Sequence, residues 1–180
     1  CNATAIENKK DLLAFLDAHG DSYIQEIRTY AKKINCAIAA GVILRDENNK
    51  IRNRLLLIGN HGNTVGYSDK IHLPQVETDM GICAGEQVNI IEYQGLRIAS
   101  AICFDIYFAE YFSMLSHKNV DLIIAPAYQR AESAQRIIAL SQVRAIDAGA
   151  FLVRASYSVD NSENFAGRSL LVAPNGKIID

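Results

Sequence analysis

Apolar residues recur at intervals of three and four along four segments of the chain, and this spacing predicts amphipathic helices. Gly20 and Gly149 follow the first and the last segment, as glycine often does at the C-terminal end of a helix. The second segment starts near Asp21 or Ser22, either of which can cap a first turn. The predicted helices cover residues 11–18, 21–34, 108–115 and 131–148.

Shorter runs of apolar and β-branched residues between these segments predict strands. Residues 45–50, and the pair Gln94 and Gly95, are turns that join neighbouring strands into hairpins. Residues 120–126 are almost wholly apolar, which is typical of a strand covered on both faces. The mixture of strand–helix units and hairpins predicts an α/β (α+β) fold in which helices cover mixed sheets. The predicted strands are 37–44, 54–59, 64–70, 88–93, 96–103, 120–126 and 151–156, followed by a last hairpin within 167–180.

The composition is that of an ordinary globular protein and narrows the possible functions. A length of 180 residues suits one domain, and 49% hydrophobic residues suffice for a sizeable core. The net charge of −2 provides no basic surface for nucleic acid or anionic membranes, and no apolar run approaches the roughly 20 residues of a transmembrane helix. The cysteines, at positions 1, 36, 83 and 103, lack the spacing of a metal site and predict reduced thiols in a cytoplasmic protein.

Both ends of the sequence predict a domain that continues beyond them. The first residue is Cys1 rather than methionine, and residues 167–180 read as a strand, a turn and the start of another strand. An N-terminal nucleophile at Cys1 is not favoured, because such a residue begins an apolar strand, whereas Cys1 leads into a polar run. We therefore expect residues 1–180 to form a single domain that is incomplete at its N- and C-terminus.

Cys103 is the first candidate for chemistry. It ends the apolar run that starts at Leu96, and a helical pattern begins almost immediately after it. A thiol at such a strand-to-helix turn is expected near backbone N–H groups and the positive end of a helix dipole, which lower a thiol pKa and can stabilise an oxyanion. The competing interpretation is an inert core cysteine, because cysteines outside disulfides are among the most buried residues.

A cysteine nucleophile needs a base and an electrostatic partner for its tetrahedral intermediate. The histidines, at positions 19, 61, 72 and 117, stand in no Cys–His context typical of a cysteine protease or a class I amidotransferase. Lys70 ends an apolar strand, and by itself such a lysine is usually a solvated residue at the rim of a sheet. The residues alone therefore favour the inert interpretation of Cys103.

Five segments, in order along the chain, resemble motifs of the nitrilase, or carbon–nitrogen hydrolase, superfamily. Residues 67–74, Tyr-Ser-Asp-Lys-Ile-His-Leu-Pro, are similar to the lysine motif of that family. Residues 103–110, Cys-Phe-Asp-Ile-Tyr-Phe-Ala-Glu, are similar to its cysteine motif, with alanine at position 109 where the family usually has proline. The other three similar segments are 121–127, 144–151 and 165–176.

This resemblance implies a four-layer αββα sandwich that needs no cofactor or metal and often dimerises through its helices. It also implies a Glu–Lys–Cys catalytic set in which Cys103 is the nucleophile. Lys70 and the backbone N–H of Phe104 would stabilise the tetrahedral oxyanion. No glutamate between Cys1 and Ser22 matches the position of the general base, so we expect that glutamate upstream of Cys1.

The family also has a further glutamate near the lysine, and Glu77, in the loop that follows Lys70, is the residue assigned to this role. The alternative for Glu77 is an ordinary surface glutamate, and Glu86 is expected to be solvated. His72 is expected to orient its neighbours in the site. Asp105 and Glu110 are expected to be structural groups that cap a helix or pair with an arginine. Tyr128 and Gln129 are expected to contact the substrate.

The favoured function is hydrolysis of a non-peptide carbon–nitrogen bond, in an amide, an N-carbamoyl amine or a nitrile, through a thioester on Cys103. The expected partners are a small-molecule substrate and further copies of the chain in a homo-oligomer. One alternative is a non-catalytic binding or assembly subunit on the same fold, and another is the glutaminase domain of a larger synthetase. A glutamate that closes an apolar strand before Cys1 would favour the enzyme over the binding subunit.

Overall fold

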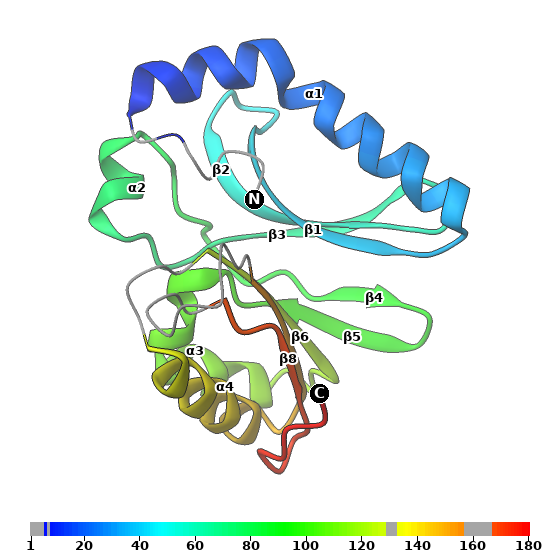
Figure 1. The fold of residues 1–180 in the computed structure, drawn as a ribbon, viewed down its shortest axis with the longest axis vertical. Coiled ribbons are helices and arrows are strands. Elements are labelled where there is room, and N and C mark those ends of the chain that lie inside the picture. Colours follow the sequence, from blue (N-terminus) through cyan, green and yellow to red (C-terminus); the bar gives the residue numbers. More distant parts are fainter. Residues whose placement is uncertain (1–5, 7, 129–132, 157–166) are drawn as a thin grey trace. The chain divides into compact units, whose positions relative to one another are not determined.

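The structure is a computed structural model that describes residues 6, 8–128, 133–156 and 167–180. The chain divides into two compact units, Cys1–Ile91 and Glu92–Asp180. One sheet has three strands and the other has five, and helices accompany both (Figure 1). These elements confirm the predicted mixed α/β class. Among the described residues, none of the helices combines the length and the apolar character that a membrane crossing requires.

The first unit begins with one long helix, α1 (Lys9–Ile34), where the sequence predicts two. Asn8 caps its start, because the side chain accepts a hydrogen bond from the N–H of Asp11 at 2.9 Å. The helix ends at Asn35, whose φ of 51° is the left-handed conformation common at helix C-termini.

The prediction that Gly20 ends a helix is wrong, because this residue lies within α1. Glycine inside a helix costs about 1 kcal/mol relative to alanine, which is a weak penalty against tertiary packing. Leu16 before the glycine and Ala31 after it are both buried, so the apolar stripe continues through the expected break.

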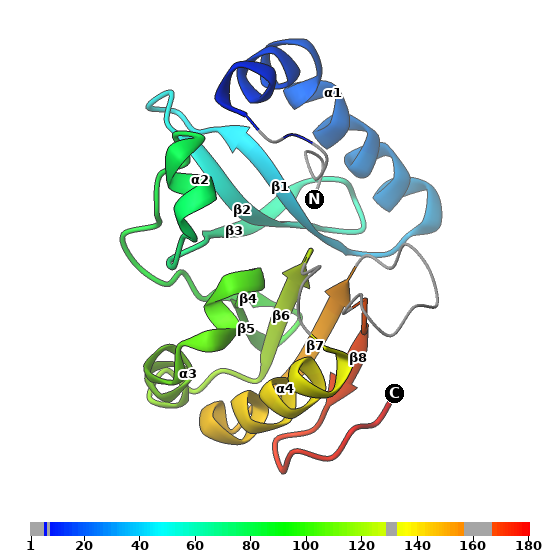
Figure 2. The ribbon, with the colours of Figure 1, turned by 60° about the vertical axis from the view of Figure 1, so that its left-hand side comes forward.

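The three-stranded sheet of this unit consists of β1 (Ile38–Arg45), β2 (Ile51–Ile58) and β3 (Thr64–Asp69). The strands are antiparallel in the order β1-β2-β3, which confirms the hairpin predicted at residues 45–50. The helix α1 runs along one face of the sheet (Figure 2). The residues that fill this contact are Ala31 from α1, Val42 and Leu44 from β1, and Leu56 and Ile58 from β2.

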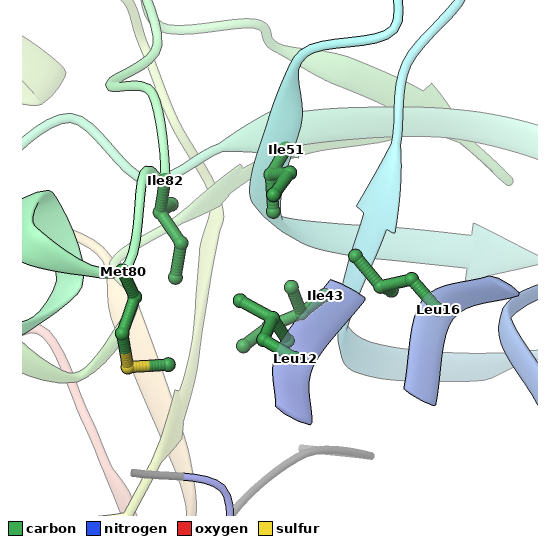
Figure 3. Packing of buried hydrophobic residues seen from close by; sticks show 6 residues of the cluster. All are labelled: Leu12, Leu16, Ile43, Ile51, Met80 and Ile82. Atoms are coloured by element: carbon green, nitrogen blue, oxygen red, sulfur yellow. The ribbon is translucent and has the colours of Figure 1, made fainter. Parts of the chain in front are cut away.

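A second apolar cluster anchors the segment after β3, which contains the short helix α2 (Gln75–Asp79). Met80 and Ile82, just beyond α2, pack with residues of α1, β1 and β2 (Figure 3). Ile82 also forms a parallel bridge with Ile51, the first residue of β2. These contacts fix α2 relative to the start of β2. The other members of the cluster are Leu12, Leu16 and Ile43.

The strand β2 starts three residues earlier than residues 54–59 predict, because its polar residues are buried with partners. Arg52, Asn53 and Arg54 are each only 7% exposed. Arg52 pairs with Asp46 at 2.9 Å, and Arg54 binds both oxygens of Asp69 at 2.6 and 2.9 Å. Charged residues are rarely buried without such partners, so a sequence pattern that favours apolar residues misses this part of the strand.

The second unit has a five-stranded sheet in the order β4-β5-β6-β7-β8. The central strands β5, β6 and β7 are parallel, and β8 is antiparallel to β7. The helices α3 and α4 lie side by side along this sheet (Figure 2). The elements are β4 (Ile91–Tyr93), β5 (Leu96–Ser100), the 3₁₀ helix η1 (Cys103–Tyr107), α3 (Ala109–Ser116), β6 (Leu122–Ala127), α4 (Ala134–Ala148), β7 (Phe151–Ser156) and β8 (Leu170–Val172).

The ends of two elements in this unit decide where candidate residues lie. The strand β5 ends at Ser100, so Cys103 is separated from the strand and begins η1. The helix α4 begins at Ala134, after Ser133, whose side chain accepts a hydrogen bond from the N–H of Arg136, and the predicted start at residue 131 lies outside the described residues. Its predicted end at Gly149 is confirmed, with a φ of 62°.

Candidate active site

Lys70 directly follows β3 and is paired with Glu77. Its Nζ atom lies 2.8 Å from each of the two carboxylate oxygens of Glu77. The side chain of Lys70 is 1% exposed and that of Glu77 is 17% exposed. A buried ammonium needs a compensating charge, and a carboxylate that presents both oxygens provides one. The alternative of a solvated lysine at the rim of the sheet is therefore excluded.

Glu77 lies on the helix α2 and not in a loop, which corrects the expectation from the sequence. Its backbone N–H donates to the carbonyl of Pro74 at 3.0 Å, within the first turn of that helix. The Ile51–Ile82 bridge holds the chain just beyond α2. Glu86, in contrast, has an 83% exposed side chain 3.9 Å from Lys50, which confirms that it is solvated.

Asn53 is a neighbour of this pair that the sequence did not indicate. Its Nδ2 atom donates to Oε1 of Glu77 at 3.1 Å, and its backbone carbonyl accepts from the N–H of Lys70 at 2.8 Å. One residue of β2 therefore contacts both members of the ion pair. A single polar residue at the start of a strand gives no signal of a partner that lies 24 positions further along the chain.

The residue before Lys70 is fixed by a separate set of contacts. Asp69 accepts two hydrogen bonds from Arg54, whose guanidinium lies 3.7 Å above the ring centre of Tyr67. The carbonyl of Lys70 accepts from the N–H of Gly85 at 2.8 Å. A Cβ atom on Gly85 would lie 2.9 Å from Cβ of Asp69, so only glycine fits here without movement. The backbone that carries Lys70 is thus held from two sides.

A buried ion pair between Asp46 and Arg52 stabilises the turn that leads into β2. Desolvation acts to raise the pKa of Asp46, but hydrogen bonds from Arg52 and from the N–H groups of Lys50 and Asn48 outweigh it and lower the pKa. The hydrogen bond with Asp46 in turn raises the pKa of Arg52. Arg52 also donates to the carbonyls of Cys83 and Ala84, so it connects β2 to the segment beyond α2.

Cys103, in the second unit, is partly buried and has a left-handed backbone. Its φ is 51°, although residues other than glycine rarely adopt positive φ values. It is the first residue of η1, a five-residue 3₁₀ helix, and α3 begins only at Ala109. The helix predicted at residues 108–115 is thereby confirmed. The left-handed conformation was not expected, since nothing in the residues around Cys103 indicates it.

Two buried charged side chains hold the backbone on either side of Cys103. Asp105 is 1% exposed, and its Oδ2 atom accepts from the N–H of Ile102 at 2.9 Å. Arg144, on α4, donates from Nε to the carbonyl of Ile106 at 2.8 Å. The capping role expected for Asp105 is thereby confirmed. Glu110, at the start of α3, is exposed.

Three other residues with predicted roles in the site, Phe104, Tyr128 and His72, are partly buried. Phe104 lies in η1, is partly buried, and has its ring centre 5.4 Å from those of Tyr107 and Phe108. Tyr128 directly follows β6 and is partly buried, whereas Gln129 lies outside the described residues. His72 lies in the segment that connects β3 to α2, and it is partly buried. The roles of these residues in catalysis or substrate binding stay predictions.

The described part of the chain also contains the thiols of Cys36, which is exposed, and Cys83, which is partly buried. Within the same part of the chain there is no group of three or more His, Cys, Asp or Glu side chains that could hold a metal ion.

Comparisons with known sequences match this chain to amidases and related hydrolases. A model of the carbon–nitrogen hydrolase family matches residues 4–180. The 2-oxoglutaramate amidase of Bacillus subtilis is 26% identical over 165 residues, and the match covers 91% of this chain and 64% of that protein. The omega-amidase YafV of Escherichia coli is 30% identical over 162 residues, covering 88% of this chain and 62% of that protein. The chain thus spans less than two thirds of the length of these relatives.

Comparisons with solved structures confirm the predicted fold. A CN-hydrolase superfamily protein from Xanthomonas campestris matches with a TM-score of 0.74 and 26% identity, covering 88% of this chain and 62% of that one. The carbon–nitrogen hydrolase of Helicobacter pylori matches with a TM-score of 0.79 over 99% of this chain and 68% of that one. Its identity of 18% shows a shared fold alone.

Proposed function

Because the chain belongs to the carbon–nitrogen hydrolase family, we propose that the protein hydrolyses small-molecule amides through a thioester formed on Cys103. The observation that carries this proposal is the left-handed conformation of Cys103 at the start of η1, where the chain turns out of β5. Non-glycine residues in such strained conformations cluster at active sites, because the surrounding structure must be built to maintain them.

In the proposed reaction, the Cys103 thiol loses its proton to a general base, and the thiolate attacks the amide carbon. The family resemblance implies that this base is a glutamate. The tetrahedral intermediate collapses to a thioester, the C–N bond breaks, and the leaving nitrogen takes a proton and departs as ammonia or an amine. Water then attacks the thioester, and the products are a carboxylic acid and the regenerated thiol.

Three further groups have assigned roles in this proposal. Lys70 and the backbone N–H of Phe104 stabilise the oxyanion of the two tetrahedral intermediates. Glu77 is the further glutamate of the catalytic set, and its role is supported by the 2.8 Å contacts of both its oxygens with the Lys70 ammonium. An ammonium held at one position costs no reorganisation when the oxyanion forms.

The proposed substrate class is a small amide, and the names of the relatives support amides that sit at the end of a carboxylic acid chain. Two relatives are an omega-amidase and a 2-oxoglutaramate amidase. Nitriles and N-carbamoyl amines are the other compounds that the chemistry permits. Tyr128 and Gln129 are proposed to contact the substrate, because they follow the end of β6. We further propose a cytoplasmic homo-oligomer, on the basis of the family resemblance and the thiols in the described part of the chain.

The test is a comparison of the intact protein with its Cys103→Ser, Lys70→Met and Cys36→Ser variants. Release of ammonia is measured with ω-amides, simple aliphatic amides, nitriles and N-carbamoyl amines. We expect amide turnover in the wild type and in Cys36→Ser, and losses of at least about 100-fold in the other two, as when an oxyanion donor or a nucleophile is removed. Unchanged turnover by Cys103→Ser would refute the proposal.

Chemical labelling tests the activation of the thiol without a substrate. Cys36 is the reference, because it is exposed and Cys103 is partly buried. Faster labelling of Cys103 than of Cys36 therefore cannot result from greater exposure. We expect iodoacetamide to modify Cys103 faster than Cys36 and Cys83, and to abolish turnover as it does so. Equal labelling of the three cysteines would count against an activated Cys103.

A further inference from the structure

The turn that carries Cys103 depends on a hydroxyl group from the following helix. Tyr111 lies on α3, is 3% exposed, and donates its hydroxyl proton to the backbone carbonyl of Ser100 at 2.5 Å. Ser100 is the last residue of β5, so this bond fixes the point where the chain leaves the strand. The next residue, Ala101, is held differently, since its N–H donates to the carbonyl of Ile124 in β6 at 3.0 Å.

The Tyr111 hydroxyl is itself held in place. Its ring packs edge-on against the ring of Phe112, with centres 5.5 Å apart. Burial, and then the negative charge of Asp105, raise the pKa of Tyr111. The hydroxyl therefore keeps its proton and acts as a donor throughout the physiological pH range.

The contacts around Cys103 form a series along the backbone. Tyr111 fixes the carbonyl of Ser100, Asp105 fixes the N–H of Ile102, and Arg144 fixes the carbonyl of Ile106. The left-handed Cys103 lies between the second and the third of these points. The φ and ψ angles of Cys103 set the plane of its peptide bond to Phe104. The same angles therefore determine the direction of the N–H that we assign to oxyanion stabilisation.

We propose that Tyr111 is a positioning residue for Cys103, because its hydroxyl anchors the end of β5 and so maintains the left-handed turn. Tyr111 acts through the backbone and not on the reacting atoms. Without the hydroxyl, the Ser100 carbonyl loses its anchor and the turn can relax toward negative φ, which both displaces the thiol and turns the Phe104 N–H. The effect on catalysis rests on the proposed function, whereas the effect on the thiol does not.

The test is Tyr111→Phe in the intact protein, a change that removes one oxygen atom. The rate of iodoacetamide alkylation at Cys103 is measured from pH 6 to pH 10 by peptide mass spectrometry, with Cys36 in the same molecule as the reference. We expect the Cys103/Cys36 rate ratio to fall by about 10-fold, the factor that corresponds to one buried hydrogen bond. The pH midpoint of Cys103 alkylation should change as well, and kcat for amide hydrolysis should fall while KM stays the same.

Two controls separate positioning from stability. Leu115→Val loosens the packing of α3 but keeps the hydroxyl and the ring contact of Tyr111, and Tyr30→Phe removes an exposed hydroxyl on α1. Both should retain the wild-type rate ratio when all variants are compared well below the lowest of their melting temperatures. If Leu115→Val slows Cys103 as much as Tyr111→Phe does, thiol reactivity follows stability and the proposal is overturned. An unchanged ratio and pH midpoint in Tyr111→Phe would overturn it as well.

These outcomes are distinct from a failure of the proposed function. If Cys103→Ser retains amide turnover, the nucleophile is another group, yet the alkylation ratio still reports on Tyr111. If Cys103→Ser is inactive and the ratio in Tyr111→Phe is unchanged, the function stands and the positioning role of Tyr111 does not.

Discussion

Replacing Glu77 with alanine should strongly destabilise the protein, because it leaves the buried Lys70 ammonium without its carboxylate. Lys70 is 1% exposed and both contacts with Glu77 measure 2.8 Å. Removing one partner of a buried ion pair typically costs about 3–5 kcal/mol. The Glu77 side chain is 17% exposed, so water can replace part of the lost interaction. We therefore expect the lower limit, about 3 kcal/mol.

The matched comparison is the double variant Lys70→Met with Glu77→Ala. Exchanging both charges for apolar groups removes the desolvation cost of the pair, so the double variant should be closer to wild type than Glu77→Ala alone. The coupling energy from the double-mutant cycle should be at least about 1.5 kcal/mol, within the range for residues in direct contact. Glu86→Ala is the control for a solvated glutamate, and it should change stability by less than about 0.5 kcal/mol.

The assay is equilibrium unfolding of the intact protein in urea, supported by thermal melting. A loss of 3 kcal/mol corresponds to a decrease of about 6–12 °C in melting temperature for a domain of 150–250 residues. If the double variant is as unstable as the sum of the two single variants, then Lys70 and Glu77 do not stabilise each other. The same result would remove the physical support for Glu77 as the residue that holds Lys70.

Three further predictions concern the described fold. Asp46→Asn should lower the free energy of unfolding by about 2 kcal/mol at pH 7. Because the fold lowers the pKa of Asp46, the stability lost in the variant should have its full value above about pH 4 and should vanish as the pH falls through the lowered pKa. Asn8→Ala should cost about 1 kcal/mol through loss of the N-cap of α1, as urea unfolding would show. Gly62→Ala should cost at least about 1–2 kcal/mol in the same assay, because the φ of this residue is +76° and a Cβ atom would lie 2.8 Å from the carbonyl oxygen of Arg28.

Each of these predictions has a result that would contradict it. A cost for Asp46→Asn that is the same at pH 3 and pH 7 would mean that the charge of Asp46 contributes nothing. Asn8→Gly should lose only a few tenths of a kcal/mol, so equal losses for alanine and glycine would argue against capping. A neutral Gly62→Ala would show that the loop adjusts without strain.

The regions predicted best are those in which the apolar period and the local chemistry agree. Residues 64–70 predict a strand that ends at Lys70, and the structure has β3 over Thr64–Asp69. Gly149 ends α4 as expected, because a left-handed glycine is a local signal that needs no distant partner. Apolar residues and turn residues express their preferences within a few positions, so the sequence alone reveals them.

The regions predicted poorly depend on contacts between distant residues. Gly20 predicted a break in α1, but packing of the helix on the sheet outweighs one unfavourable residue. The sequence does not predict residues 51–53 at the start of β2, because Arg52 and Asn53 are buried against Asp46 and Glu77, which lie outside the strand.

The same cause limits the prediction of the candidate site. The lysine and cysteine motifs indicate Lys70 and Cys103, and the glutamate that the resemblance implies near the lysine is assigned to Glu77 from its distance of seven residues. Neither the hydrogen bond from Asn53 to Glu77 nor the left-handed φ of Cys103 has a local signal. Both follow from how the completed fold surrounds these residues.

The order of strands in the two sheets has a consequence for how the chain folds. The strands β1, β2 and β3 pair with their neighbours in sequence, so their contacts close short loops. The parallel pairs of β5 with β6 and of β6 with β7 need long crossovers, which fold more slowly because more chain entropy is lost before any pairing forms. Since residues 1–91 also leave the ribosome first, the Lys70–Glu77 pair should form before the turn at Cys103 does. The turn at Cys103 would therefore be among the later parts of the fold to form.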